Sequence, residues 1–170
     1  MKPPSRVARP AKAASKPGVR LPAKDLAQIR AIAATANMRT TSKRKVLLFS
    51  GTHASAAAQA MAKKLRRDPY RVDLSTVVSK YIGETEKNLQ RVFAEAEAKG
   101  ATLILDEADA LFGKRAVVMD AHDRYSNLEV DYLLRRIEEY DGLVLLVSKP
   151  GLTLPMTLQR RFSVYKFPPP

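Results

Sequence analysis

The stretch Thr102-Leu-Ile-Leu-Asp106-Glu107 decides the fold of this 170-residue chain. Four residues, three of them apolar, lead directly into two adjacent carboxylates. A short run that is apolar on both faces is expected of a strand buried inside a parallel sheet. In an open parallel sheet, ligands bind beyond the carboxyl ends of the strands. The stretch therefore predicts a buried strand over residues 102–106 that presents two carboxylates to a ligand site.

The two adjacent carboxylates allow two interpretations. Asp106 could hold Mg²⁺, which in proteins favours one or two carboxylates plus phosphate oxygens. Glu107 could then orient and deprotonate an attacking water. Alternatively, the pair opens a helix, where the helix dipole stabilises its negative charge. On these two residues alone, both interpretations stay open.

Further apolar runs and amphipathic segments alternate on either side of this stretch. Apolar residues recur at helical spacing in four segments, and short apolar runs indicate strands between them. This alternation is typical of βαβ units and predicts a three-layer α/β fold. The expected strands lie near residues 46–50, 70–74, 102–106, 143–148 and 163–167. The expected helices lie over 23–36, around Met61–Leu65, around Leu89–Ala96 and around Val130–Ile137.

The start of the last expected helix has its own signal. Ser126 and Glu129 stand three residues apart, just before the apolar positions that begin at Val130. This spacing matches a capping box, in which a serine hydroxyl and a glutamate carboxylate satisfy the first backbone N–H groups of a helix. The pattern predicts that the helix begins at Ser126.

Composition excludes several classes of site. The chain has no cysteine, which excludes disulfides and thiolate metal sites, and its two histidines argue against a zinc centre. No apolar run approaches the length that a bilayer-spanning helix needs, and the N-terminus lacks an apolar signal core. We therefore expect no membrane span and a cytoplasmic location.

The net charge of +13 is concentrated at the N-terminus. Residues 1–45 carry twelve Lys or Arg and one acid, whereas residues 46–170 carry eighteen Lys or Arg and sixteen acids. We interpret residues 1–22 as a disordered basic leader, because they hold almost no large apolar side chains. The leader could contact an acidic partner, a nucleic acid or anionic lipid, or it could be a solvated tail without a partner.

Three longer segments resemble a known family. Asp106-Glu-Ala-Asp-Ala-Leu-Phe-Gly-Lys-Arg115 resembles the Walker B segment of the AAA family of P-loop ATPases. Ser79-Lys-Tyr-Ile-Gly-Glu-Thr-Glu-Lys-Asn-Leu89 is similar to its first pore-loop segment, and Leu158-Gln-Arg-Arg-Phe162 to its arginine-finger segment. The order and spacing match the family over roughly residues 45–168. Residues 120–140 further resemble bacterial AAA proteins that accompany contractile injection systems.

The resemblance implies roles for the matching residues. Asp106 would bind Mg²⁺ through water or directly, and Glu107 would polarise the hydrolytic water. Arg160 and Arg161 would reach the γ-phosphate bound by a neighbouring subunit, where a guanidinium stabilises the developing charge. Tyr81-Ile82-Gly83 would grip an extended polypeptide inside a ring. The plainer alternatives are a surface arginine pair and a half-buried aromatic side chain.

The phosphate-binding loop departs from the family pattern G-x-x-x-x-G-K-[ST]. The corresponding stretch reads Phe49-Ser-Gly-Thr-His-Ala-Ser-Ala-Ala-Ala-Gln59 and contains no lysine. Aligning the flanking strand and helix puts His53 at the second glycine, Ala54 at the lysine and Ser55 at the Mg²⁺-binding hydroxyl. An ungapped alignment puts Ala57 at the lysine. The missing lysine predicts weak nucleotide binding and argues against efficient hydrolysis.

Other groups could still bind phosphate. Gly51 and Thr52 precede the expected helix, whose N-terminus is a modest anion site. Lys149 follows the strand expected beside the loop, and we hypothesise that it supplies the missing positive charge. The alternative is a lysine in a tolerant loop. His53 is interpreted as a loop residue rather than a base.

Together these observations predict a P-loop α/β sandwich with strand order 5-1-4-3-2 over residues 23–170. The sequence ends just after the last expected strand, so we expect no helical lid domain. ATP and Mg²⁺ are the expected cofactors, and the expected partner is a protein substrate or an AAA homologue, with a hexameric ring if the chain assembles. The first functional hypothesis is an ATPase core that remodels a protein. The alternatives are an inert pseudo-ATPase that binds proteins, and nucleic-acid binding through the leader.

Overall fold

A single parallel sheet organises the chain. The computed structural model describes residues 20–37, 46–113, 121–152, 154 and 159–168. The strands are β1 (Val46–Ser50), β2 (Pro69–Asp73), β3 (Thr102–Asp106), β4 (Val144–Ser148) and β5 (Phe162–Lys166). They lie side by side in the order β2-β3-β4-β1-β5, and every neighbouring pair is parallel. The predicted order 5-1-4-3-2 is confirmed, and each strand lies within one residue of its expected position.

Strand register brings the carboxyl ends of the strands to one edge of the sheet. Ser50 at the end of β1 pairs with Ser148 on β4 and with Lys166 on β5. On the other side, Asp73 at the end of β2 pairs with Asp106 at the end of β3. The residues that follow β1, β3 and β4 therefore meet at the same edge, where a ligand site is expected in this class of sheet.

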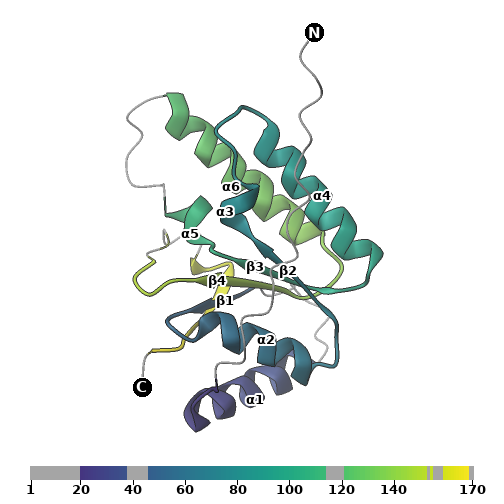
Figure 1. Cartoon of the computed structure of the whole chain (residues 1–170), viewed down its shortest axis with the longest axis vertical. Helices are drawn as coiled ribbons and strands as arrows, with labels where there is room; N and C mark the ends of the chain where they lie inside the picture. Colours follow the sequence, from purple (N-terminus) through teal and green to yellow (C-terminus); the bar gives the residue numbers. More distant parts are fainter. Residues whose placement is uncertain (1–19, 38–45, 114–120, 153, 155–158, 169–170) are drawn as a thin grey trace.

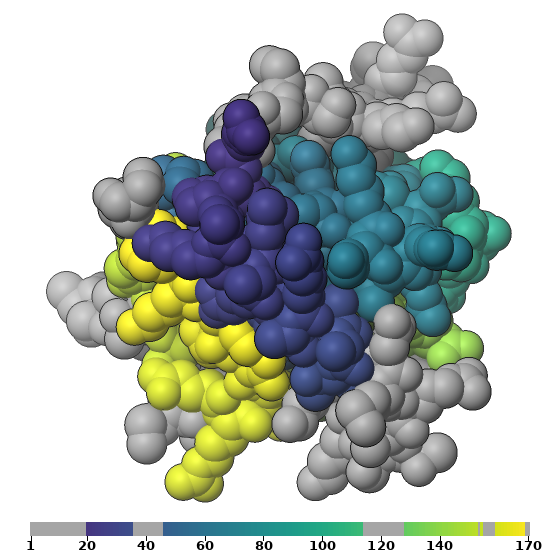
Figure 2. Space-filling view, turned by 90° about the horizontal axis from the view of Figure 1, so that it is seen from below, coloured from purple at the N-terminus to yellow at the C-terminus, as the bar shows by residue number. Residues whose placement is uncertain are grey.

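Helices cover both faces of the sheet, which confirms the three-layer α/β sandwich (Figure 1). One face carries α1 and α2, and the other carries the remaining four helices. Figure 2 shows α1 lying across its face beside the segment that contains β5. The helices are α1 (Ala23–Asn37), α2 (Ala54–Lys64), α3 (Leu74–Val77), α4 (Glu84–Ala98), α5 (Asp109–Phe112) and α6 (Ala121–Glu139).

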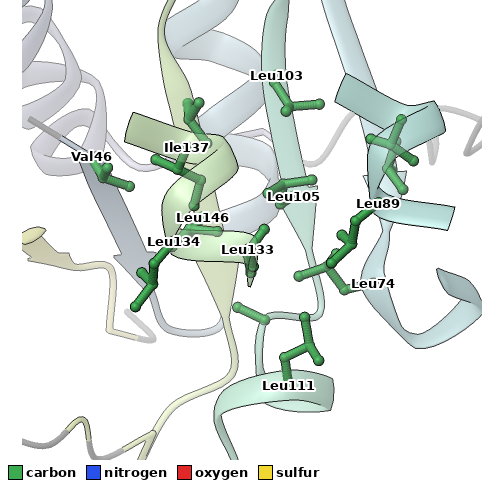
Figure 3. Close-up of a cluster of buried hydrophobic side chains, with 14 of the residues drawn as sticks. Val46, Leu74, Leu89, Leu103, Leu105, Leu111, Leu133, Leu134, Ile137 and Leu146 are labelled. Atoms are coloured by element: carbon green, nitrogen blue, oxygen red, sulfur yellow. The ribbon is translucent and has the colours of Figure 1, made fainter. Parts of the chain in front are cut away.

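Two hydrophobic clusters form the core, one on each face of the sheet. Successive residues of one strand point to opposite faces, so Leu103 and Leu105 of β3 join one cluster and Ile104 joins the other. Figure 3 shows the larger cluster, in which α6 packs against the sheet. Burial on both faces explains why β3 and β4 are almost continuously apolar.

One helix boundary was predicted wrongly. Helix α6 begins at Ala121, so its backbone is already helical at Ser126. The capping-box spacing of Ser126 and Glu129 therefore lies inside the helix and does not mark its start. Spacing alone cannot distinguish a true N-cap from a serine that lies one turn into a helix, because both positions are followed by apolar residues at helical intervals.

Some predictions fall outside the described residues. The leader was predicted over residues 1–22, of which only 20–22 are described. Lys114, Arg115 and Leu158 of the motif segments also lie outside the described part. Among the described helices, none is long and apolar enough to cross a membrane.

Candidate functional site

A cavity of about 430 Å³ opens at the carboxyl ends of β1, β3 and β4. Its walls come from the loop after β1, the first turns of α2, one side chain of β2 and the residues that end β3 and β4. The lining residues are Gly51, Thr52, His53, Ser55, Ala56, Gln59, Arg71, Asp106, Glu107, Val147, Ser148 and Lys149. Most of the residues that the sequence predicted for nucleotide and metal binding therefore line this cavity.

The loop after β1 is held by close backbone packing. Gly51 adopts φ +129°, which side chains rarely tolerate, and a Cβ at this residue would lie 2.2 Å from the carbonyl oxygen of Phe167. Its N–H donates to the carbonyl of Ser148 (3.2 Å), and the N–H of Phe167 donates to the carbonyl of Ser50 (2.7 Å). Only a glycine fits between these strands, so the chain turns sharply from β1 into α2.

Ala54 begins α2 but does not line the cavity. Its side chain is fully buried and packs in the same core cluster as Phe49. Ala57, which the ungapped alignment places at the lysine position, is fully buried in that cluster too. The structure thus places neither alanine where a lysine side chain would face a ligand.

Asp106 at the end of β3 is bound by a side chain that sequence reasoning missed. The guanidinium of Arg71, on β2, donates to Asp106 Oδ2 through Nε (3.1 Å) and through Nη2. Arg71 Nη2 also donates to the hydroxyl of Ser55 (2.6 Å), which itself donates to Asp106 Oδ2 (3.0 Å). The side chains of Arg71 and Asp106 are only 13% and 12% exposed. The three residues form a nearly dry cluster at the wall of the cavity.

Arg71 left a weak signal in the sequence. Arg71 is a charged residue inside the run that was expected as a strand near residues 70–74. A charged side chain in the second strand of a buried sheet needs a partner, because an unpaired buried charge is costly. The partner could not be identified without the pairing of β2 with β3, which brings the two strand ends together.

Glu107 adopts a backbone conformation that is uncommon for a residue with a side chain. Its φ is +56°, and its N–H donates to Asp106 Oδ1 (2.9 Å). The carboxylate turns toward Lys149, whose Nζ lies 3.5 Å from Glu107 Oε2. The Lys149 side chain is 72% exposed and that of Glu107 is 37% exposed, so this ion pair is largely screened by water.

Lys149 is fixed by its backbone rather than by its side chain. Its N–H donates to Asp109 Oδ2 (2.9 Å), and its carbonyl accepts from the Ser50 hydroxyl (3.3 Å). The preceding residue, Ser148, is only 3% exposed, and its hydroxyl has no hydrogen-bond partner in the described part of the chain. Ser148 lines the cavity, but its hydroxyl oxygen is itself covered, so the hydroxyl is a buried polar group beside the cavity and is not exposed in it.

His53 faces the first helix. Its Nδ1 lies 3.3 Å from Oδ2 of Asp25, a residue of α1 that is only 2% exposed. His53 also lines the cavity, and that it is a loop residue rather than a base stays a prediction. Asp25 carried no recognisable signal in the sequence, because it stands alone in a basic segment.

The predicted pore-loop residues lie apart from the cavity, at the start of α4. Tyr81 and Ile82 are 61% and 74% exposed, and neither lines the cavity. Gly83 adopts φ +81° and is the N-cap of α4. The loop is shaped by Ser79, whose N–H donates to Thr85 Oγ1 (2.9 Å) and whose hydroxyl donates to Glu84 (2.7 Å). Two large apolar side chains are therefore held out in solvent by a hydrogen-bonded turn.

The two arginines before β5, Arg160 and Arg161, are also exposed and do not line the cavity. Arg161 Nη1 contacts Glu138 Oε1 on α6 at 3.2 Å. No ion pair of Arg160 is found within the described residues.

The cluster around Asp106 does not fit a divalent cation as it stands. Asp106 Oδ2 accepts three hydrogen bonds, from Arg71 Nε, Arg71 Nη2 and Ser55, and Oδ1 accepts from the Glu107 N–H. A carboxylate offers about four lone-pair sites on its two oxygens, so Oδ2 is fully occupied by Arg71 and Ser55 and has no site left for the predicted Mg²⁺. In the described ranges, no group of three or more His, Asp or Glu side chains is placed to hold a metal ion.

Two groups at the cavity wall are of the kind that binds anionic oxygens. The first N–H groups of a helix have no partner within the helix, and α2 begins at the cavity wall. The exposed Lys149 side chain lies at the part of the wall formed by the end of β4. Helix N-termini and ammonium groups both bind anions such as phosphate.

Comparison with known proteins agrees with the fold. Residues 46–167 match the family model described as the ATPase family associated with various cellular activities (AAA). The chain is 35% identical to a vesicle-fusing ATPase of Arabidopsis thaliana over 117 residues, which are 61% of this chain and 16% of that protein. It is 28% identical to the 26S proteasome regulatory subunit 10B of Dictyostelium discoideum over 122 residues, 67% of this chain and 31% of that protein. It is also 31% identical to spastin of Danio rerio over 103 residues, 59% of this chain and 17% of that protein.

The chain thus spans less than a third of the length of each of these relatives. The match to the family model, however, covers the whole sheet from β1 to β5, including the cavity and the predicted pore-loop segment. It also covers more than two thirds of the chain. The chain belongs to the AAA family of ATPases.

Proposed function

We propose that this chain is an AAA-type core that binds the phosphate chain of ATP in the cavity and acts on a protein partner, with little or no hydrolysis. The observation that carries the proposal is the cavity at the carboxyl edge of the sheet, where the N-terminus of α2 and the exposed Lys149 side chain both lie at the wall. A helix N-terminus and an ammonium group both bind anionic oxygens.

Two kinds of group would hold the phosphates. The N-terminus of α2 offers backbone N–H groups and the positive end of the helix dipole. Lys149 offers an exposed ammonium, which replaces the charge that the loop after β1 lacks. Because Lys149 follows β4, it reaches the cavity wall from a different strand than that loop.

Two features argue against efficient hydrolysis. The loop from Phe49 to Gln59 contains no lysine, and Ala54 and Ala57 point into the core. Glu107, the residue that would polarise water in the family, pairs with Lys149. The carboxylate of Glu107 is thus turned toward the Lys149 ammonium, 3.5 Å away.

The protein partner would be contacted by the exposed loop before α4. Tyr81 and Ile82 present a large apolar surface in solvent, which is typical of an interaction site rather than a folded core. In a ring of six subunits, Arg160 and Arg161 would lie at the boundary between neighbours. On the resemblance of residues 120–140, we place proteins of a contractile injection system among the partner classes to test.

A binding experiment tests the proposal. We expect saturable binding of a fluorescent ATP analogue that unlabelled ATP competes away. Lys149→Met should weaken it by about tenfold or more, since one charge-assisted contact contributes roughly 1.5–3 kcal/mol. Lys63→Met, an exposed lysine on α2 that does not line the cavity, is the matched control and should bind like the wild type. If the Lys149→Met variant binds the analogue as tightly as the wild type does, Lys149 does not contact the nucleotide.

The second candidate is a pseudo-ATPase that binds proteins and no nucleotide. The cluster of Arg71, Asp106 and Ser55 favours it, because these side chains satisfy one another without a ligand. An absence of analogue binding at millimolar concentrations would select this candidate and reject the first. The partner would then be sought through the exposed Tyr81–Ile82 surface.

A further inference from the structure

Arg71 reaches the ligand site from a strand that does not otherwise contribute to it. It lies on β2, at the far edge of the sheet from β5, and its backbone pairs with Ile104 rather than with Asp106. The long side chain extends along the sheet toward the carboxyl ends of the strands and joins the cavity wall there. An arginine that crosses from β2 to the end of β3 brings a permanent positive charge to this edge.

The contacts of Arg71 fall on the two side chains that the family resemblance assigns to the metal. Its Nε and Nη2 donate to Asp106 Oδ2, and Nη2 also donates to the Ser55 hydroxyl. Ser55 in turn donates to the same carboxylate oxygen. A divalent cation bound directly by Asp106 Oδ2 and the Ser55 hydroxyl would have to occupy the space that the guanidinium fills.

Charge compensation around the cavity is already complete. Leaving His53 aside, the lining residues include two carboxylates, Asp106 and Glu107, and two cationic side chains, Arg71 and Lys149. Asp106 and Arg71 are the buried pair, while Glu107 and Lys149 are the solvated pair. Adding a divalent cation would place two further positive charges beside Arg71, in a nearly dry environment where like charges repel strongly.

We propose that Arg71 is a built-in replacement for the divalent cation, so that this site takes the phosphate groups of its ligand without a metal ion. The guanidinium neutralises Asp106, as a metal would, and keeps that carboxylate from repelling an anionic ligand. Its Nη1 takes part in no hydrogen bond with the described residues, and Arg71 lines the cavity. Nη1 is therefore available to a phosphate oxygen. The ligand identity rests on the proposed function; the exclusion of the metal does not.

A metal-binding experiment without nucleotide tests the exclusion of the metal directly. Mn²⁺ alone, followed by electron paramagnetic resonance, is titrated into the purified full chain. The wild type should show no Mn²⁺ binding that Asp106→Asn removes. Arg71→Met, which frees the carboxylate, should gain a Mn²⁺ site that the double variant Arg71→Met/Asp106→Asn loses. Arg135→Met, an exposed arginine on α6 outside the cavity, is the matched control and should behave like the wild type.

A nucleotide experiment tests the consequence. The fluorescent ATP analogue is titrated in excess Mg²⁺ and, separately, in EDTA. For the wild type we expect affinities within about threefold of each other. For Arg71→Met we expect the affinity in EDTA to fall about tenfold or more, through loss of one charge-assisted contact, and Mg²⁺ to restore part of it. Arg71→Lys keeps the charge and should still exclude Mn²⁺, which shows that charge rather than shape excludes the metal.

The outcomes separate the two proposals. Asp106-dependent Mn²⁺ binding by the wild type, or binding of the analogue that requires Mg²⁺, would overturn the replacement by Arg71. Failure of Arg71→Met to gain a Mn²⁺ site, with a folded circular dichroism spectrum, would overturn it too. If no chain binds the analogue, the proposed function fails, and the Mn²⁺ results alone decide whether Arg71 excludes the metal. If Arg71→Met does not fold, the comparison of Mg²⁺ with EDTA in the wild type still decides.

Discussion

Nδ1 of His53 lies 3.3 Å from Oδ2 of Asp25, so a side-chain contact joins helix α1 to the loop that borders the ligand cavity. Asp25 is 2% exposed and His53 is largely covered, which makes this a contact of the interior rather than of the surface. The two helices that bear on the contact, α1 and α2, pack side by side on the same face of the sheet (Figure 2). The start of α2 is thereby fixed from outside the sheet.

Removing His53 should therefore destabilise the fold. His53→Ala leaves the buried Asp25 carboxylate without this partner, which typically costs about 1–3 kcal/mol. Urea unfolding measures the change, and the double variant His53→Ala/Asp25→Asn should cost less than the sum of the single variants, because both remove one contact. Thr52→Ala, an exposed residue of the same loop, is the control and should stay within about 0.5 kcal/mol of the wild type. Additive effects would mean that the contact contributes nothing.

Gly51→Ala should be more damaging than Gly83→Ala, although both glycines have positive φ. At Gly51 a methyl group would lie 2.2 Å from the Phe167 carbonyl oxygen, whereas at Gly83 nothing lies within 4 Å. We expect Gly83→Ala to cost about 1 kcal/mol from backbone strain alone, and Gly51→Ala to cost about 2 kcal/mol or more through the added clash. Thermal unfolding of the two variants side by side gives the comparison, and equal losses would contradict the close approach of the two segments.

The exposed loop before α4 should matter for binding and not for stability. Tyr81→Ala and Ile82→Ala remove side chains that are mostly in solvent, so each should change the free energy of unfolding by less than about 0.5 kcal/mol. Both should weaken binding of a fluorescently labelled unfolded polypeptide, measured by anisotropy. Leu128→Ala is a matched control, because Leu128 is also a large apolar side chain, 57% exposed, on α6. If Leu128→Ala weakens binding equally, the polypeptide contact is not specific to this loop.

Phosphate release from ATP should not depend on Glu107. A working general base contributes about 10²–10⁴-fold to a rate, so Glu107→Gln in an efficient ATPase would cause a drop of that size. We expect no such drop here, because the phosphate loop has no lysine and Glu107 is paired with Lys149. The measurement is the rate of phosphate release by the wild type and by Glu107→Gln, with Glu97→Gln, exposed on α4, as the control. A large difference between the first two would identify the chain as an active hydrolase.

Tyr70, which does not line the cavity, provides a pH-dependent prediction. Burial, together with the hydrogen bond from its hydroxyl to Glu95 and the charge of that carboxylate, raises the pKa of Tyr70 from 10.0 to about 12. A pKa raised by folding favours the neutral form of the native state, so its contribution to stability is complete below pH 10 and is lost as pH rises toward 12.

Replacing Tyr70 should show this contribution. The difference in free energy of unfolding between the wild type and Tyr70→Phe should be constant below pH 10 and shrink between pH 10 and 12. Urea unfolding over this pH range measures it, and ultraviolet absorbance of the tyrosinate gives the pKa directly. A Tyr70 that titrates at its ordinary pKa would rule out the buried hydrogen bond.

The strands were predictable because they are buried on both faces. The runs that became β1, β3 and β4 are apolar at nearly every position, and burial in a parallel sheet is the physical reason for that composition. The apolar runs alone did not predict the order of the strands in the sheet. It came from the resemblance of three motif segments to the AAA family, and the topology confirms it.

The site was only partly predictable. Asp106, Glu107 and Lys149 stand directly after apolar runs, and a residue at a strand end is placed at the carboxyl edge whatever its neighbours are. Arg71 and Asp25 reach the site from other elements, through contacts that depend on strand pairing and helix packing. Such contacts join residues that are distant in sequence, so no local pattern reports them. The start of α6 was predicted wrongly for the opposite reason. The capping-box spacing of Ser126 and Glu129 is present in the sequence, but it does not mark the first residue of the helix.

The backbone contacts of Phe167 tie the end of β5 to the turn after β1. The hydrogen bond from the Phe167 N–H to the Ser50 carbonyl and the close approach at Gly51 leave almost no slack between the two segments. In mechanical terms the pair is a stiff linkage. A force applied to the chain just beyond β5 would therefore act first on the turn at Gly51, which borders the cavity. Conversely, a ligand that fixed this turn would also restrict the motion of the end of β5.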